Sequence, residues 1–233
     1  ECNDSGLNLI KERIIGLEEV RTAVREAKRD FEEGAVGAGT GTVCFGLKGG
    51  IGSASRQFTA GGSTYTVGAL VQSNFGSTKN LVICGEPVGR ALEKKIKPAD
   101  LDRGSIMTVI ATDLPLSDRQ LKRVIRRAGV GLSRTGSFMG HGSGDIMIGF
   151  TTANRIPEST DQEVLTIRVL KESSLDTAFT AAAEAVEEAV LNSLAMAETT
   201  VGYQGEIRYS LTDLWLADRG TREQPAAVFS MEE

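Results

Sequence analysis

Residues 104–128 read GSIMTVIATDLPLSDRQLKRVIRRA, and this stretch predicts a buried strand followed directly by a helix. The strand begins at Ser105 and is rich in β-branched residues, which favour a pleated and buried surface. In the helix, Ser117 is placed to cap the first turn and Gln120 to complete a capping box. A helix that follows a buried strand indicates a layered fold in which helices cover a sheet.

Further strands and helices are predicted on both sides of this unit. The predicted strands cover residues 42–47, 65–72, 81–84, 145–152 and 163–170, and the predicted helices cover residues 17–32 and 174–196. The helix over 174–196 is dominated by alanine, whose small side chain permits close packing on a sheet. Because strands and helices mix without strict alternation, the sequence predicts a layered α/β or α+β domain.

The composition is that of an ordinary globular protein. Of 233 residues, 40% are apolar and 24% are charged, and the net charge is −5. This balance lacks the basic surplus that nucleic-acid binding requires. The apolar runs are far shorter than the roughly 20 residues that span a bilayer. We therefore expect a soluble protein that binds neither nucleic acid nor membrane.

Three cysteines and a single histidine limit the chemistry. Cys2, Cys44 and Cys84 lie far apart without a Cys-x-x-Cys pair, so we expect neither a zinc site nor a disulfide framework. Unpaired thiols are typical of the cytoplasm, where we expect the protein to reside. A Ser-His-Asp triad would depend on His141 alone, so we expect an enzyme here to use a different base.

Glycine is the unusual count, at 27 residues, and two glycine-rich stretches are candidate sites. Gly37, Gly39 and Gly41 follow neither the G-x-G-x-x-G nor the Gly-Lys-Ser/Thr pattern of phosphate loops, so tight turns are the better interpretation. The loop Gly136–Asp145 places hydroxyls, His141 and a carboxylate within ten residues, and its glycines leave backbone amides uncovered. On these residues alone, a plain connector is the simpler interpretation of that loop.

The junction between Gly104 and Ser105 carries the sharpest hypothesis. There an exposed and charged segment, residues 85–104, ends and a buried strand begins with serine. Attack of the serine hydroxyl on the preceding carbonyl would form an ester, and water would then free a new N-terminus. The new terminal serine would carry a nucleophile and, as base, an α-amine with a pKa of roughly 7.7 to 8.0. An ordinary loop-to-strand transition is the alternative.

Several strings, taken together and in this order, resemble the L-aminopeptidase/D-esterase family, the self-processing peptidases that include the β-peptidyl aminopeptidases. They are ECND at 1–4, GTGTVCFGLKGGIGSASR at 39–56, YTVGALVQSN at 65–74, GSIMTVIATD at 104–113, and GSGD at 142–145 followed by FTTAN at 150–154. The resemblance extends from Glu1 to about Leu216 and implies a four-layer αββα sandwich similar to the ornithine acetyltransferase fold. It also implies activity without metal or cofactor.

The activity implied by the resemblance is that of an autoproteolytic N-terminal serine aminopeptidase or amidase, which releases N-terminal amino acids from peptides, amides or esters. Residues 1–233 would form a single catalytic domain, cut between Gly104 and Ser105 into 1–104 and 105–233. Family members usually assemble as homo-oligomers. They also begin well before the equivalent of Glu1, so we expect that an N-terminal portion is missing.

The same resemblance implies roles for individual residues. Ser105 would be the nucleophile, and Asn74 would donate a hydrogen bond to the oxyanion. Ser143 and Asp145 would orient or neutralise the amine and the hydroxyl of Ser105. A carboxylate beside an ammonium group favours its charged form, so Asp145 is expected to bind or shuttle a proton rather than to act as a nucleophile.

Two positions depart from the family or receive no role from it. Gly6 stands where the family often has a tyrosine near the acyl site, and His141 matches no functional residue. Two other interpretations stay open. One is acyl transfer as in the ornithine acetyltransferase group, which generally uses threonine where this chain has Ser105, and the other is a non-catalytic homologue that acts as an assembly subunit. The sequence does not choose between L-α, D- and β-amino acyl groups.

Overall fold

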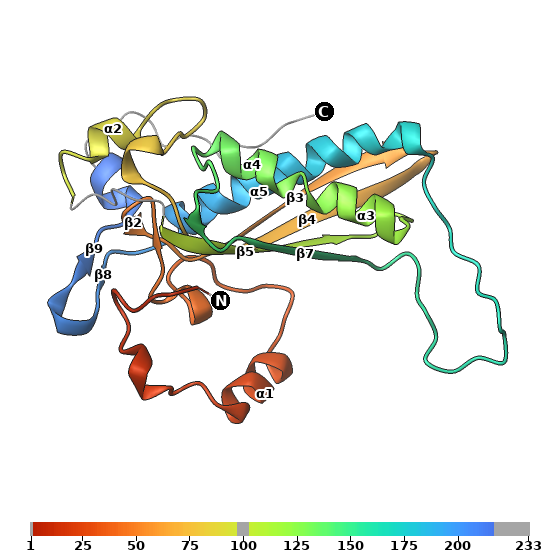
Figure 1. Cartoon of the computed structure of the whole chain (residues 1–233), viewed down its shortest axis with the longest axis horizontal. Coiled ribbons are helices and arrows are strands. Elements are labelled where there is room, and N and C mark those ends of the chain that lie inside the picture. The colour runs from red at the N-terminus through yellow and green to blue at the C-terminus, as the bar shows by residue number, and fades with distance from the viewer. Residues whose placement is uncertain (1, 97–102, 217–233) are drawn as a thin grey trace.

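The structure is a computed structural model, and it describes residues 2–96 and 103–216 (Figure 1). The α-helices are α1 (Leu17–Arg25), α2 (Gly89–Leu92), α3 (Asp118–Ile125), α4 (Ala128–Arg134) and α5 (Leu175–Ala195). The strands are β1 (Val43–Cys44), β2 (Leu47–Lys48), β3 (Ile51–Ala60), β4 (Ser63–Asn74), β5 (Arg103–Thr112), β6 (Gly142–Ser143), β7 (Ile146–Thr151), β8 (Thr200–Val201) and β9 (Ile207–Arg208). Short 3-10 turns cover Ile10–Glu12, Gly37–Gly39, Thr78–Asn80, Glu172–Ser174 and Tyr203–Gly205, and a π-helical turn covers Thr212–Leu216.

Five of these strands form the main sheet. β3, β4 and β5 are antiparallel neighbours, and β5 pairs in parallel first with β6 and then with β7. The register places Asn74, at the end of β4, opposite Ser105, near the start of β5. The same end of β5 pairs with β6, where Gly104 lies opposite Ser143. Three strand ends therefore meet at one end of the sheet.

Helices α3, α4 and α5 lie along one face of the sheet (Figure 1). Helix α5 packs on β3 and β4, and helix α4 packs on α5. Val71 and Ile110 point from the sheet into this layer and are fully or almost fully buried, as are Ala182 and Ala189 of α5. The predicted alanine-rich helix over 174–196 is confirmed, and its small side chains bring the helix close to the strands.

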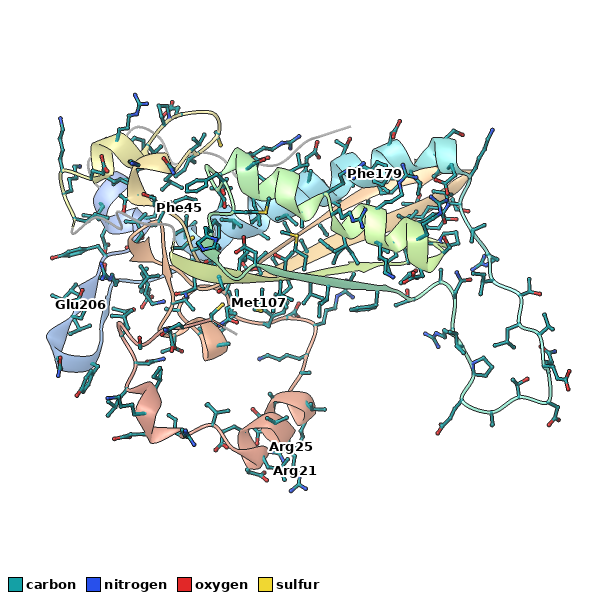
Figure 2. All side chains as sticks on the ribbon, viewed as in Figure 1. Arg21, Arg25, Phe45, Met107, Phe179 and Glu206 are labelled. Atoms are coloured by element: carbon teal, nitrogen blue, oxygen red, sulfur yellow. The ribbon has the colours of Figure 1, made fainter. Side chains whose placement is uncertain are left out.

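The opposite face of the sheet is also apolar but is less covered by the described residues. Met107, which Figure 2 shows on this side of the sheet, is half-buried, as is Val109. On β7, Ile146, Ile148 and Phe150 are 50%, 57% and 52% exposed. A strand that is apolar on both faces is typical of a sheet with both faces packed. The described chain covers one of these faces.

Other predicted elements are confirmed in place and in detail. The strands predicted over 65–72, 105–112 and 145–152 correspond to β4, β5 and β7. At the start of α3, the Ser117 hydroxyl accepts a hydrogen bond from the Gln120 amide, and the Gln120 side chain accepts one from the Ser117 amide. The mixed α/β class is therefore confirmed, with helices layered on a sheet.

One predicted helix is shorter than expected and one predicted strand is absent, because nothing in the described chain packs against them. The predicted helix over 17–32 ends at Arg25, and its apolar side chains Val20 and Val24 are exposed. A short amphipathic helix gains most of its stability from packing, which is missing here. The predicted strand over 163–170 has no regular structure, because no described strand pairs with it.

Three further differences come from turns and from an edge strand. The predicted strand over 42–47 is the hairpin of β1 and β2, turned at Phe45 and Gly46 with φ of 52° and 81°. The predicted strand over 81–84 is broken by a turn at Cys84. β3 was not predicted, because its sequence IGSASRQFTA is largely polar, as is common for strands at a sheet edge.

The charged connection predicted over 85–104 contains the short helix α2, as expected. Val88 and Leu92 are nevertheless buried, so this part packs on the core rather than lying free in solvent. Residues 97–102 of the connection lie outside the described residues.

Candidate active site

The residues predicted to form one site come from three adjacent strand ends. Asn74 ends β4 and lies opposite Ser105 on β5. Ser143 lies on β6, in register with Gly104, and Asp145 follows immediately before β7. The register therefore brings the predicted nucleophile, oxyanion donor and hydroxyl–carboxylate pair to the same end of the sheet.

The Gly104–Ser105 peptide is approached by two hydrogen-bond donors. The Ser105 hydroxyl donates to the carbonyl oxygen of Gly104 at 2.7 Å. The backbone N–H of Gly144 donates to the same oxygen at 2.9 Å. Donors aimed at a carbonyl oxygen stabilise the negative charge that develops there during nucleophilic attack. The serine hydroxyl and a charge-stabilising amide therefore both lie beside the carbonyl of the predicted cleavage site.

Glycine at positions 104 and 144 permits this close approach. A Cβ atom on Gly104 would lie 2.0 Å from the carbonyl oxygen of Asn74, a distance at which atoms clash. A Cβ on Gly144 would lie 3.0 Å from Oγ of Ser105. Residue 104 must therefore be glycine for β4 to run this close to the serine, whereas a side chain at residue 144 would crowd the hydroxyl of Ser105.

The side-chain amide of Asn74 is held at both ends. Its Oδ1 accepts a hydrogen bond from the N–H of Val43 at 2.9 Å, and its Nδ2 donates to the carbonyl of Asn3 at 3.1 Å. The residue is 5% exposed. Because Oδ1 is bonded to a backbone donor, the orientation of the amide is fixed, and the NH₂ group faces the segment that contains Asn3.

Ser143 and Asp145 form a hydrogen-bonded pair next to the Gly104 backbone. The Ser143 hydroxyl donates to Oδ1 of Asp145 at 2.6 Å, and both residues are half-buried. The thiol of Cys2 lies 3.6 Å from the carbonyl oxygen of Ser105. Burial raises the pKa of this thiol, and the negative charge of Asp145 acts in the same direction. The carboxylate therefore contributes to the electrostatics around Ser105.

A pocket of about 580 Å³ opens at the serine and is lined by Asn3, Ser5, Gly104, Ser105, Gly142 and Gly144. The residues that line it have small side chains, apart from Asn3. There is also open space at Gly6, which follows Ser5, because a Cβ there would meet no atom within 4 Å. His141, which received no predicted role, is exposed just before β6. A larger hollow of about 690 Å³ lies between β3 and α5, away from the serine, where Arg56 is paired with acidic side chains of α5.

The buried lysine of this region was not predicted from the sequence. Lys48, on β2, is fully buried and donates hydrogen bonds to three backbone carbonyls. A signal was present, because Lys48 is the one charged residue in the run 39–55 of glycine, apolar and hydroxyl residues. A charged side chain that is buried requires such hydrogen-bond partners.

Within residues 2–96 and 103–216, no group of three or more His, Cys, Asp and Glu side chains is placed to hold a metal ion. Cys2, Cys44 and Cys84 form no disulfide bond. Among the helices of the same ranges, none has the length and apolar character needed to cross a membrane.

The fold is similar to that of a prototype of the serine aminopeptidases. The L-aminopeptidase D-Ala-esterase/amidase of Ochrobactrum anthropi, a prototype of that class and a variant of the Ntn-hydrolase fold, superimposes with a TM-score of 0.82 and 39% identity, over 89% of this chain and 57% of its own. A β-aminopeptidase of a Burkholderia species superimposes with a TM-score of 0.82 and 37% identity, over 95% and 64%. The PH0078 protein of Pyrococcus horikoshii OT3 superimposes with a TM-score of 0.85 and 51% sequence identity, over 91% of this chain and 58% of its own.

The sequence comparisons identify the family. The sequence model of peptidase family S58 matches residues 1–208, and the chain belongs to this family. The β-peptidyl aminopeptidase BapA of Sphingosinicella microcystinivorans is 39% identical over an alignment of 223 residues, and the match covers 88% of this chain and 56% of that protein. BapA of Sphingosinicella xenopeptidilytica is 38% identical over an alignment of 183 residues, and the match covers 73% of this chain and 46% of that protein. The chain thus spans about half the length of these relatives, and the predicted family resemblance is confirmed.

Proposed function

We propose that the protein is a self-processing N-terminal serine aminopeptidase or amidase, activated by cleavage between Gly104 and Ser105. The observation that carries this proposal is the Gly104 carbonyl, whose oxygen accepts hydrogen bonds from both the Ser105 hydroxyl and the Gly144 amide. An attacking hydroxyl and an oxyanion donor are the two groups that acyl transfer from this carbonyl requires.

In the proposed cleavage, Oγ of Ser105 attacks the carbonyl carbon of Gly104. The C–N bond breaks, the proton of the hydroxyl passes to the departing nitrogen, and an ester links Gly104 to the serine oxygen. During this step the negative charge on the Gly104 oxygen is stabilised by the N–H of Gly144. Water then hydrolyses the ester, which leaves a carboxylate on Gly104 and a free amine and hydroxyl on Ser105.

In the proposed turnover, the free α-amine of Ser105 accepts the proton of its own hydroxyl as that oxygen attacks the substrate carbonyl. The amide of Asn74, oriented by Val43, donates to the oxyanion of this second reaction. The Ser143–Asp145 pair, in register with Gly104, would stabilise the protonated form of the new amine. The leaving amine takes the proton, and water releases the acyl group and regenerates Ser105.

The proposed substrates are peptides, amides or esters with a free N-terminal amino group. The names of the relatives, a β-peptidyl aminopeptidase and an L-aminopeptidase D-Ala-esterase/amidase, support this class. The pocket beside Ser105 is lined mostly by glycine and serine, whose small side chains leave room for an acyl group next to the nucleophile. The proposed reaction uses neither a metal nor a cofactor.

We also propose that this chain contributes two layers of a four-layer αββα sandwich, as the family resemblance implies. The apolar and half-exposed face of β5 and β7 supports this, because a second sheet at about 10 Å would bury Ile146, Ile148 and Phe150. The relatives are long enough to supply such a sheet. The similarity to the ornithine acetyltransferase fold stays a prediction, and so does assembly as a homo-oligomer.

Intact-mass analysis tests the cleavage. The proposal predicts two pieces, residues 1–104 and 105–233, and a single uncut chain with full activity would refute it. A panel of p-nitroanilides with L-α, D- and β-amino acyl groups tests turnover and reads the specificity. A flat response from correctly cleaved protein would favour the non-catalytic alternative. Transfer to an added amine that outruns hydrolysis would favour the acyl-transfer alternative.

A further inference from the structure

We propose that Lys48 is a positioning residue of this enzyme, and that it holds the side-chain amide of Asn74 in its donating orientation through the peptide between Thr42 and Val43. The inference rests on the proposed function, since it assigns Lys48 to the oxyanion donor of that reaction. It adds a residue that neither touches the substrate nor belongs to the predicted site.

The ammonium group of Lys48 is bound by backbone alone. Its Nζ donates to the carbonyls of Gly39 at 2.7 Å, Thr42 at 3.0 Å and Gly49 at 2.7 Å. Three hydrogens therefore meet three acceptors, which uses the full donor capacity of the group. Burial lowers its pKa to about 8, with the nearby Cys44 and Asp4 acting in the opposite direction, so the group is charged at neutral pH.

One peptide unit connects this ammonium to the proposed oxyanion donor. The carbonyl of Thr42 accepts from Lys48, and the N–H of Val43, at the other end of the same planar unit, donates to Oδ1 of Asn74 at 2.9 Å. Because the peptide is planar, fixing the direction of its carbonyl also fixes the direction of its N–H. A positive charge at the carbonyl end also polarises the unit and strengthens the bond at the other end.

The consequence appears at the far side of the Asn74 amide. With Oδ1 bonded to Val43, the NH₂ group must face the carbonyl of Asn3, a residue that lines the pocket beside Ser105. If the amide rotated by half a turn, it would set its NH₂ against the N–H of Val43 and point an oxygen at the oxyanion. Lys48 opposes that rotation by holding the carbonyl of Thr42, together with those of Gly39 and Gly49, around its ammonium group.

A double-mutant cycle in the intact protein tests the inference. Lys48→Met keeps the aliphatic stem and removes the ammonium, and we expect kcat to fall about 10- to 100-fold with KM within about threefold, because the lost interaction acts in the transition state. Lys79→Met is the matched control, since Lys79 is exposed in the turn Thr78–Asn80, and it should leave both constants unchanged.

In the Asn74→Ala background, adding Lys48→Met should lower kcat by less than about a further twofold, because the effects of two residues that act through one contact are not additive. Losses that multiply would overturn the inference, and so would a folded Lys48→Met protein with turnover within threefold of wild type. Where Lys48→Met does not fold at the assay temperature, Lys48→Gln, whose amide still donates two hydrogen bonds, enters the same cycle under the same criteria.

A crystal structure of the Lys48 variant gives a readout that does not depend on turnover. We expect the Asn74 Oδ1 to separate from the N–H of Val43 beyond about 3.2 Å or the amide to rotate. An unchanged Asn74 would overturn the inference even in an active enzyme. A displaced Asn74 in a variant whose wild-type parent hydrolyses nothing would instead refute the proposed function and leave the positioning role standing.

Discussion

Two loops meet at Ser105, and they are held in opposite ways. The loop of residues 39–49 is built around the fully buried Lys48 and reaches the site through Asn74, which is itself buried. The loop of residues 140–145 is half-exposed and holds the site through short β-pairing and the Gly144 amide. A buried loop suits a fixed dipole that must not reorient, whereas an open loop suits groups that exchange protons with substrate and solvent.

The largest effect on self-cleavage and hydrolysis is expected at Ser105, which lies between the two loops. Ser105→Ala removes the hydroxyl for self-cleavage and for turnover, so intact mass should show one uncut chain and hydrolysis should fall at least about 10⁴-fold. Ser133→Ala, at an exposed hydroxyl on α4, is the control and should be cut and active. Hydrolysis that survives Ser105→Ala would show that the nucleophile lies elsewhere.

The buried loop should contribute the next largest effect. Asn74→Ala removes the fixed donor, and kcat should fall about 10²- to 10³-fold, the usual cost of losing an oxyanion donor. The pH at which turnover is maximal should not move, because Asn74 does not titrate. Steady-state kinetics over a pH series measures both quantities. A loss below threefold would mean that the oxyanion is bound by other donors.

The open loop should give a smaller loss with a different signature. Asp145→Asn removes a negative charge next to the proposed Ser105 amine, so kcat should fall about 10- to 100-fold. The pKa of that amine should also fall, since the charged form loses its partner, and the acidic limb of the pH–rate profile should move to lower pH. Asp118→Asn, exposed on α3, is the matched control. An acidic limb that stays in place would separate Asp145 from the amine.

The smallest effect is expected in the pH dependence of the free energy of unfolding, and it comes from Lys48 in the buried loop. The pKa of Lys48 is lowered from 10.5 to about 8 in the folded protein. Between these values the unfolded chain binds more protons, so the free energy of unfolding of the wild type should rise with pH relative to Lys48→Met. The slope is at most about 1.4 kcal/mol per pH unit. Urea unfolding of both proteins between pH 7 and 9.5 measures it, and a difference that falls with pH would contradict the assigned shift.

The parts of the fold that could be predicted are those in which local sequence and packing agree. The strand from Ser105 and the cap at Ser117 and Gln120 are visible because β-branched residues and capping side chains act over a few positions. The alanine-rich α5 is visible because its small residues recur over 21 positions. The predicted strand over 163–170 was wrong because a strand needs a neighbour, which alternation of side chains alone does not reveal.

The site divides in the same manner. The family motifs point to Ser105, Asn74 and Asp145, and the register of β4, β5 and β6 brings their backbones together. Lys48 stands out in the sequence as the one charged residue of 39–55, but its role could not be predicted, because its partners are carbonyls, which every residue carries. For the same reason, the sequence showed that the loop 136–145 leaves amides uncovered, but not that the amide of Gly144 would reach Gly104. Backbone groups acquire specific roles only when the chain is folded around them.

The place of Gly104 has one further consequence. Gly104 lines the same pocket as Ser105, and β6 pairs with the chain at this point. After the proposed cleavage of the Gly104–Ser105 bond, the new carboxylate of Gly104 therefore lies where the acyl part of an incoming substrate must bind. The protein would therefore be its own first substrate and then be inhibited by the product of its own cleavage. The lag before full activity would measure how fast the new C-terminus leaves the pocket.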